Sequence, residues 1–176
     1  MCVWEINKSY LRISYMNKIY IIVDDNIWSK HLGFDEWNIL LPKVFDKIVS
    51  MKKCRNCSVN LLLTNDMNIQ KLNNKFRYKN VPTNVLSFPQ YNPKDKELGI
   101  GNINLGDIAM SFETIRTESI QFCIDLFNRC THLFVHGVLH LFGMDHIKED
   151  DRLKMETLEV EILNFFGIKN PYILEK

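Results

Sequence analysis

Three histidines in the run HGVLHLFGMDH have the spacing of a metal site. His136 and His140 are four residues apart, so a helix would project both imidazole rings from one face, ~6 Å apart. Gly143 can end such a helix in a left-handed conformation that other residues adopt only at a cost, and the chain can then return His146 toward the first two rings. Three neutral imidazoles and a water form the open, four-coordinate zinc site typical of enzymes. We therefore predict His136, His140 and His146 as the ligands of one zinc ion.

The spacing equals that of the zinc-protease motif H-E-x-x-H-x-x-G-x-x-H, with one difference. Gly137 stands where those proteases carry the glutamate that accepts a proton from zinc-bound water. A metal site is therefore expected, but ordinary peptidase chemistry is not. Nickel or iron would suit three histidines as well as zinc does, because the affinity order alone does not select the metal.

The other polar residues near this run have less specific signals. Asp145 precedes His146, and three roles are open to it: a hydrogen bond that fixes the tautomer of a histidine ring, general base, or cap of the turn, in that order of preference. His132 lies one turn before His136 and is read first as a hydrogen-bonded helix residue, with support of a ligand or contact with substrate as alternatives. His31 has no partner nearby in the sequence and is read as structural.

Composition places the chain among single globular domains. It has 176 residues, 46% of them hydrophobic and 24% charged, which is enough for one full core. A net charge of +1 means that any nucleic-acid binding must come from a local patch. The first residues contain no apolar stretch of signal-peptide length, and no run approaches the ~20 apolar residues of a membrane span. We expect a soluble, cytoplasmic protein with an N-terminal extension over residues 1–17 and one metal-dependent hydrolase domain over 18–176.

The cysteines favour a reducing compartment over a disulfide framework. There are five, an odd number at irregular positions. Cys54 and Cys57 form a single C-x-x-C, which is a weak metal or redox signal without a second pair. The simpler reading is that Cys57 is a small apolar residue at the start of a strand.

Hydrophobic periodicity predicts an α+β fold in which a four-stranded mixed sheet packs with about five helices. The metal site is expected on a central helix and the turn that follows it, as in zincin-like folds. Helices are expected over 35–51 (with Pro42 as a kink or a break), 65–76, 112–127, 130–142 and 149–166. Strands are expected over 18–24, 57–64, 83–88 and 103–111, with a surface loop at 91–102. Gly106 suggests a bulge or a close backbone approach, and Leu153, Leu158, Ile162, Phe165 and Phe166 are expected to face the core.

Two further blocks, together with the histidine run, give the chain a specific resemblance. The stretch LNNKFRYKNVPTNVLSFP (72–89), the block LGDIAMS (105–111) and the histidine run occur in the order seen in the YbeY endoribonuclease (rRNA maturation factor) family. The C-terminal pattern of Met155, Glu159, Ile162, Leu163 and Gly167 also fits. The resemblance covers roughly residues 57–170. Asn80, where an Asp is usual, is one of a few departures, and none of them touches the three histidines.

The resemblance implies a zinc-bound endoribonuclease that is selective for single strands and acts in small-subunit rRNA 3′-end maturation and ribosome quality control. It implies the metal ligands His136, His140 and His146, and a functionally important Arg77. It also implies ribosomal and single-stranded RNA as substrates, with small ribosomal subunit proteins and an assembly GTPase as partners, and neither DNA nor membrane.

The chemistry of these residues is compatible with that activity. Zinc lowers the pKa of bound water toward ~7, and a guanidinium such as that of Arg77 can bind a phosphoryl group through two hydrogen bonds. Lys71, Lys75 and Lys79 surround Arg77 and would follow RNA phosphates, although a helix end also favours cations. The attacking group is either zinc hydroxide or the RNA 2′-hydroxyl, and the first is preferred.

Two other functions stay open at this point. One is a zinc-stabilised ribosome-assembly or RNA-binding module that does not cut, which the glycine at position 137 keeps in play. The other is an amide or peptide hydrolase with a displaced base, for which Asp145 and Asp107 are the acidic residues nearest to the motifs.

Overall fold

The structure is a computed structural model that describes residues 17–31, 33–91 and 102–173. The expectations for the N-terminal extension and for most of the 91–102 loop lie outside these residues. The elements follow in the order β1 (Lys18–Val23), α1 (Ile27–His31), α2 (Phe34–Met51), β2 (Cys57–Thr64), α3 (Asp66–Arg77), β3 (Val85–Pro89), β4 (Ile103–Ser111), α4 (Phe112–Gln121), α5 (Leu126–Leu141) and α6 (Glu149–Phe165).

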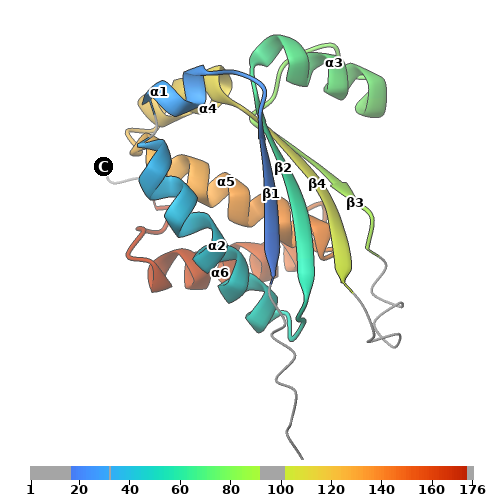
Figure 1. Ribbon diagram of the computed structural model, residues 1–176. Coiled ribbons are helices and arrows are strands. Elements are labelled where there is room, and N and C mark those ends of the chain that lie inside the picture. Colours follow the sequence, from blue (N-terminus) through green and yellow to red (C-terminus); the bar gives the residue numbers. More distant parts are fainter. Residues whose placement is uncertain (1–16, 32, 92–101, 174–176) are drawn as a thin grey trace, which may run out of the picture.

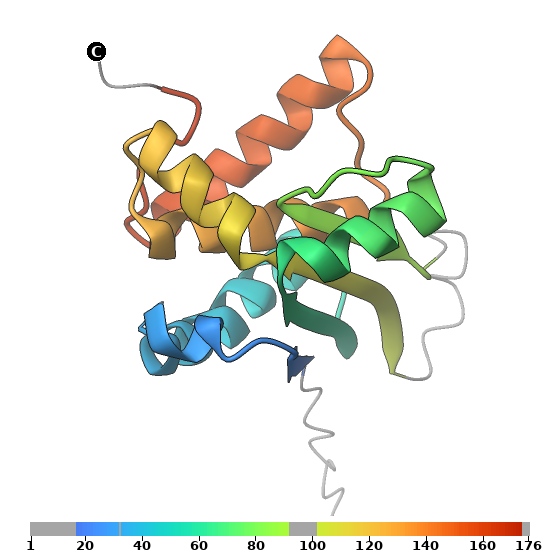
Figure 2. The same ribbon diagram turned by 90° about the horizontal axis from the view of Figure 1, so that it is seen from above.

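The four strands form one mixed sheet, as predicted, in the order β1-β2-β4-β3. Strands β1, β2 and β4 are parallel, and β3 pairs antiparallel with β4 at the edge. Helices α1, α3 and α4 begin shortly after the carboxyl ends of the parallel strands, the end from which Figure 2 views the molecule. The predicted α+β class is confirmed, with the short helix α1 as an addition.

The helices cover the two faces of the sheet unequally. Helices α2, α5 and α6 lie together on one side (Figure 1), where the main core includes Leu61, Ile108 and Val138. Helix α3 packs on the other face through a small cluster around Ile69, Leu86 and Ala109. Because successive residues of a strand point to opposite faces, Ile108 faces α5 while its neighbour Ala109 faces α3.

Helix α5 is the central helix of the fold. It contacts β3, β4, α2, α4 and α6, and most of its length is buried. Polar side chains on such a helix must find partners inside the protein, since an unpaired buried polar group costs stability. The histidines of the motif are therefore placed in a region that demands defined hydrogen bonds.

Several predicted boundaries were wrong. Helix α4 ends at Gln121 and α5 begins at Leu126, because Cys123 turns the chain with a φ of 53° and the Asp125 side chain caps α5 by accepting from the Asn128 N–H at 3.0 Å. Strand β3 begins at Val85 rather than at Thr83. These ends depend on caps and turns that hydrophobic periodicity does not register.

Two further expectations were corrected within helices. Pro42 neither divides nor ends α2, which runs unbroken from Phe34 to Met51. Leu153 and Phe165 do not face the core: their exposed fractions are 49% and 66%. Helix α6 buries instead a face that contains Met155, Glu159, Ile162 and Leu163.

Glycine at position 106 is required by the sheet itself. Gly106 has a φ of 129°, and a Cβ there would lie 2.2 Å from the Phe88 carbonyl oxygen. The β2–β4 register shifts between Ser58 and Asn60. Both the predicted bulge and the close backbone approach are therefore present.

Candidate metal centre

The three predicted ligands come together in the structure. One ring nitrogen from each of His136, His140 and His146 lies within 4.8 Å of the other two. The ring centroids are 4.5 Å apart for His136 and His140, 5.3 Å for His136 and His146, and 5.0 Å for His140 and His146. In the described part of the chain, no other group of histidine, cysteine and acidic side chains has this arrangement.

The turn after α5 brings His146 back to the other two rings. Gly143 has a φ of 79°, its N–H donates to His140 O at 2.9 Å, and the Met144 N–H donates to Leu139 O at 3.1 Å. This pair of bonds is the usual left-handed termination of a helix, which glycine adopts without strain. The predicted role of Gly143 is confirmed.

Hydrogen bonds fix the tautomers of two of the ligands. The Nδ1 of His136 lies 2.8 Å from Glu159 Oε1, and the Nδ1 of His140 lies 2.9 Å from Met144 O. Since both partners are acceptors, both Nδ1 atoms carry the hydrogen of a neutral ring. The Nε2 atom of each ring therefore keeps a lone pair.

These two lone pairs point at one another. The Nε2 atoms of His136 and His140 are 3.0 Å apart, and neither has a hydrogen to donate when the tautomers are those set by Glu159 and Met144. Such a pair repels unless a positive group lies between the two atoms. A metal ion bound at about 2.0–2.1 Å from each imidazole nitrogen satisfies both. The donor set therefore fits a divalent metal such as zinc.

Burial favours the metal-binding form of the rings. Burial, reinforced by the neighbouring His136 ring, lowers the pKa of His140 to about 4, so this imidazole is neutral near pH 7. A histidine must be neutral to bind a metal, so this imidazole is suited to that role.

Glu159 is the residue that the sequence reasoning left without a role. It is fully buried on α6, accepts from His136 through Oε1 at 2.8 Å, and accepts from His132 Nε2 through Oε2 at 2.8 Å. The Tyr172 hydroxyl donates to the same Oε2. Burial opposes its ionisation, but the hydrogen bonds from His132 and His136 outweigh burial and hold the pKa of Glu159 at about 2.

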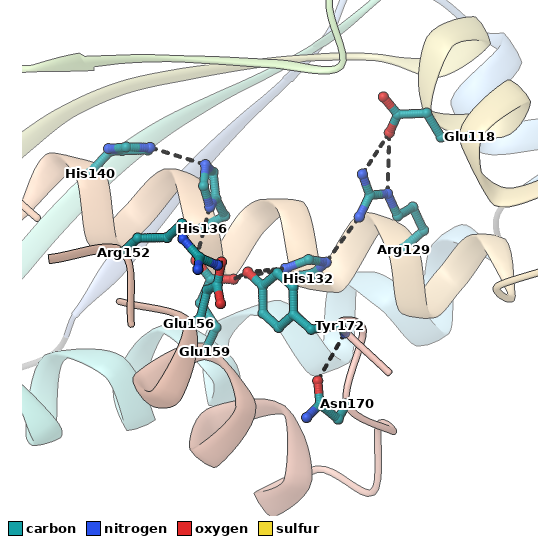
Figure 3. A network of polar contacts seen from close by, with 10 residues as sticks. All are labelled: Glu118, Arg129, His132, His136, His140, Arg152, Glu156, Glu159, Asn170 and Tyr172. Carbon is teal, nitrogen blue, oxygen red and sulfur yellow. Dashed lines mark hydrogen bonds and ion pairs between the residues drawn. The ribbon is translucent and has the colours of Figure 1, made fainter. Parts of the chain in front are cut away.

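The contacts continue along α5 away from the metal position (Figure 3). Arg129 donates from Nη1 to His132 Nδ1 at 3.1 Å and from Nη2 to Glu118 Oε2 at 2.8 Å. His132 is therefore a neutral, hydrogen-bonded helix residue, as preferred from the sequence, and it also supports a ligand through Glu159. Burial is the main cause that lowers its pKa.

A cavity of about 210 Å³ opens beside the histidines. The residues that line it are His136, His146, Arg152, Met155, Glu156, Glu159 and Tyr172. Arg152 donates to Glu156 at 2.7 Å, so a carboxylate and a guanidinium from α6 lie next to two of the ligands. Sequence reasoning missed Arg152 and Glu156 and named Glu159 only as part of the family pattern, although their spacing of four and three residues places all three on one helix face.

The structure gives the two residues predicted as catalytic different positions. The Asp145 carboxylate accepts the His146 backbone N–H at 2.7 Å, which is the turn-capping role. Arg77 is the exposed last residue of α3. Within the described residues, no hydrogen bond or ion pair connects Arg77 with the histidines.

Position 137 has no room for an acid. A Cβ on Gly137 would lie 3.1 Å from Ile108 Cδ1 and 3.2 Å from Ser87 Oγ, and Ser87 donates to the Gly137 carbonyl at 3.2 Å. This side of α5 packs directly on the sheet. Asp107 faces away from α5 and accepts from Asn60 at 2.6 Å and from Gln90 at 2.8 Å.

Comparison with known proteins decides the family. The family model described as Endoribonuclease YbeY matches residues 23–167. The chain belongs to the endoribonuclease YbeY family. The resemblance predicted from the histidine run and the 72–89 block is thereby confirmed, and with it the expected class, a hydrolytic enzyme of RNA.

Individual YbeY relatives show the same similarity. The endoribonuclease YbeY of Bartonella bacilliformis is 45% identical over 114 residues, which cover 65% of this chain and 71% of the relative. That of Ruegeria pomeroyi is 37% identical over 155 residues, covering 79% and 93%. The solution structure of TM1509 from Thermotoga maritima matches with a TM-score of 0.56 at 23% identity, covering 85% of this chain and 92% of that one, and supports the fold.

The remaining expectations concern thiols and membranes. Cys57 is buried at the start of β2, as expected, with its Sγ 3.3 Å from that of Cys54, and the four cysteines of the described residues are free thiols. None of the helices in the described part of the chain is long and apolar enough to cross a bilayer.

Proposed function

We propose that this YbeY-family protein is a zinc-dependent endoribonuclease selective for single-stranded RNA, acting in small-subunit rRNA 3′-end maturation and ribosome quality control. The observation that carries the proposal is the convergence of the His136 and His140 Nε2 lone pairs, 3.0 Å apart, with a nitrogen of His146 within 4.8 Å. Family membership supplies the substrate class.

The chain's residues would divide the work in a simple way. His136, His140 and His146 would hold the metal, while Glu159 and the Met144 carbonyl orient two of the rings. Bound zinc supplies a Lewis acid and a nucleophilic hydroxide near neutral pH. Orientation of ligands by such hydrogen bonds also raises their basicity.

Cleavage also needs a proton acceptor and a group that stabilises charge on the phosphate. Hydrolysis of a phosphodiester consumes one water, whose proton must reach a base. Two carboxylates are candidates for this base: Asp145, next to His146, and Glu156, which lines the cavity beside His136 and His146. Arg77 is the proposed phosphate-binding guanidinium, since its planar fork matches two phosphoryl oxygens.

The alternative of a peptide or amide hydrolase with a displaced base loses one of its two acidic candidates. Asp107 lies on the other face of the sheet and accepts hydrogen bonds from Asn60 and Gln90, so Asp145 alone would have to serve as that base. The proposed substrate is ribosomal RNA. The proposed partners are small ribosomal subunit proteins and an assembly GTPase, and the proposed location is the cytoplasm.

The test combines metal content with RNA cleavage. Plasma mass spectrometry should find about one zinc per chain in the wild type and almost none in His136→Ala, with His31→Ala as the matched control because His31 packs against Phe112 away from the site. The wild type should cut a single-stranded oligoribonucleotide and spare its duplex, and His140→Ala should lose cleavage. A folded, zinc-loaded wild type that binds RNA but never cuts it would support the non-catalytic assembly module instead.

A further inference from the structure

The end of α3 carries exposed aromatic rings among cations. Phe76 and Tyr78 have exposed fractions of 53% and 91%, and they alternate with Lys75, Arg77 and Lys79. Between residues 67 and 91 the chain has four cationic side chains, the fourth being on Lys71, and no acidic one. This charge of +4 exceeds the net charge of the whole chain, +1, so the segment is the local basic patch that nucleic-acid binding requires.

None of the four cations is neutralised within the described residues. The ion pairs found there involve none of them. Lys71 donates to the neutral Asn68 side chain, and the Lys75 Nζ lies 5.1 Å from the Phe76 ring centroid. The charge is therefore available to a polyanion.

The backbone presents Tyr78 in an unusual way. Its φ is 59° and its ψ 28°, the left-handed conformation that glycine adopts freely and other residues only at a cost. Here the ring is almost wholly exposed, and in the described part of the chain it has neither an aromatic partner nor a hydrogen bond at its hydroxyl.

The loop that carries this ring is fixed by the protein. The Tyr78 N–H donates to Asn74 O at 3.1 Å and the Lys79 N–H donates to Asn73 O at 3.3 Å. The buried Asn73 side chain donates to Val81 O at 2.8 Å, and Phe76 packs edge-on against Phe88 with centroids 5.1 Å apart. The Tyr78 ring is thus held outward on an ordered base, which lowers the entropy lost on binding a ligand.

We propose that Tyr78 is a base-stacking residue for single-stranded RNA, with Arg77 and Lys79 binding the phosphates on either side of the stacked nucleotide. The proposal rests on the proposed function and names the surface that would hold its substrate. Aromatic rings between cations suit single strands, because every unpaired base has a face to stack and every nucleotide carries a phosphate. A base within a duplex is already stacked, so the same ring also favours single strands over duplexes.

Two variants of Tyr78 distinguish the contribution of its aromatic ring from the contributions of its hydroxyl and its backbone conformation. Tyr78→Gly removes the ring and suits the left-handed backbone, so the fold is kept or stabilised. Tyr78→Phe keeps the ring and removes only the hydroxyl. Tyr20→Ala is the matched control, since it removes a half-exposed tyrosine from β1.

The measurement is the Kd of the full-length protein for a single-stranded oligoribonucleotide that contains 2-aminopurine. The fluorescence of this base reports stacking, and a gel checks that the RNA stays intact. Stacking contributes about 1–3 kcal/mol per base, so Tyr78→Gly should weaken binding by about 5- to 150-fold and abolish the fluorescence change. Tyr78→Phe and Tyr20→Ala should stay within about twofold of the wild type. Lys79→Ala should reduce the slope of log Kd against log salt by about 0.7, whereas Tyr78→Gly leaves this slope unchanged.

The outcomes distinguish this proposal from the proposed function. If the wild type cuts RNA and Tyr78→Gly binds as tightly as the wild type, the stacking role is wrong while the nuclease stands. Equal losses in Tyr78→Phe and Tyr78→Gly would also overturn it, because the contact would then belong to the hydroxyl. A zinc-loaded wild type that binds no single-stranded RNA overturns both proposals.

Discussion

Glu159 on α6 accepts the Nδ1 hydrogen of His136 on α5 at 2.8 Å, across 23 residues of sequence. The bond fixes which nitrogen of His136 is available to a metal. It also ties α6 to the metal helix through a carboxylate that is fully buried. A ligand that looks local in the sequence therefore depends on a helix that follows it.

Replacing this carboxylate by an amide should weaken metal binding. In Glu159→Gln the amide NH₂ cannot accept a hydrogen bond, so the side chain loses either the hydrogen bond from His136 or the one from His132. If the lost contact is to His136, the ring can move its hydrogen to Nε2, the nitrogen needed by the metal. Loss of a carboxylate that supports a ligand typically costs about 10- to 100-fold in metal affinity. Competition with a chromogenic zinc chelator measures it.

Two further variants make this prediction specific. Glu161→Gln removes an exposed acid two residues away on the same helix and should leave zinc affinity unchanged. Tyr172→Phe removes one of the three donors to Glu159 and should have a smaller effect than Glu159→Gln. Wild-type zinc affinity in Glu159→Gln would contradict the role assigned to this carboxylate.

Gly137 should resist any attempt to restore a protease-like glutamate. Gly137→Glu would place a charge between α5 and the sheet, close to Ile108 and Ser87, and leave it unpaired, which costs about 3–5 kcal/mol. In Gly137→Ala, overpacking of about 1–3 kcal/mol is partly offset by about 1 kcal/mol of helix propensity. Urea denaturation should therefore rank wild type above Gly137→Ala above Gly137→Glu.

The control for this series is an exposed helix position. Thr157→Glu on α6 should change the free energy of unfolding by no more than about 0.5 kcal/mol. A stable Gly137→Glu protein with new peptidase activity would show that the packing against the sheet had been misread.

The thiols should differ sharply in reactivity. Cys123 is exposed, whereas Cys57 and Cys130 are buried, and burial is the main cause that raises the pKa of both buried thiols. Because the thiolate is the nucleophile, iodoacetamide at pH 8 should modify Cys123 quickly and Cys130 only after urea unfolds the chain. Peptide mass mapping measures each site, and equal native rates at Cys123 and Cys130 would contradict the burial of Cys130.

The parts of the fold that sequence could predict are those with local signals. The limits of β2 and β4 were predicted to the residue, because each is a β-rich run between turn residues. The three histidines and Gly143 were also recognised, since their meaning lies in spacing along one helix and one turn.

The support for the ligands could not be predicted in the same way. Glu159 reaches His136 only because α6 folds back along α5. The family pattern includes Glu159, but nothing in the sequence of α6 marks it as buried. The apolar pattern of α6 predicts that Leu153 and Phe165 face the core. Both are exposed, and the face that α6 buries contains Glu159 instead. Tertiary contacts, which decide both points, override local pattern.

Arg77 should matter for cleavage and not for the metal. In its proposed role of binding the phosphoryl group, its guanidinium would stabilise charge that grows in the transition state, and removal of one such donor costs about 10²–10³ in kcat. Arg77→Ala should show this loss with unchanged zinc content, because Arg77 lies on α3 while the ligands lie on α5 and the turn after it. Arg77→Lys should recover little, since an ammonium cannot form the two-pronged contact.

Lys154→Ala, on the exposed surface of α6, is the control, and steady-state cleavage of a labelled single-stranded RNA is the measurement. If Arg77→Ala changed only the salt dependence of KM, Arg77 would be a general phosphate contact like its neighbouring lysines.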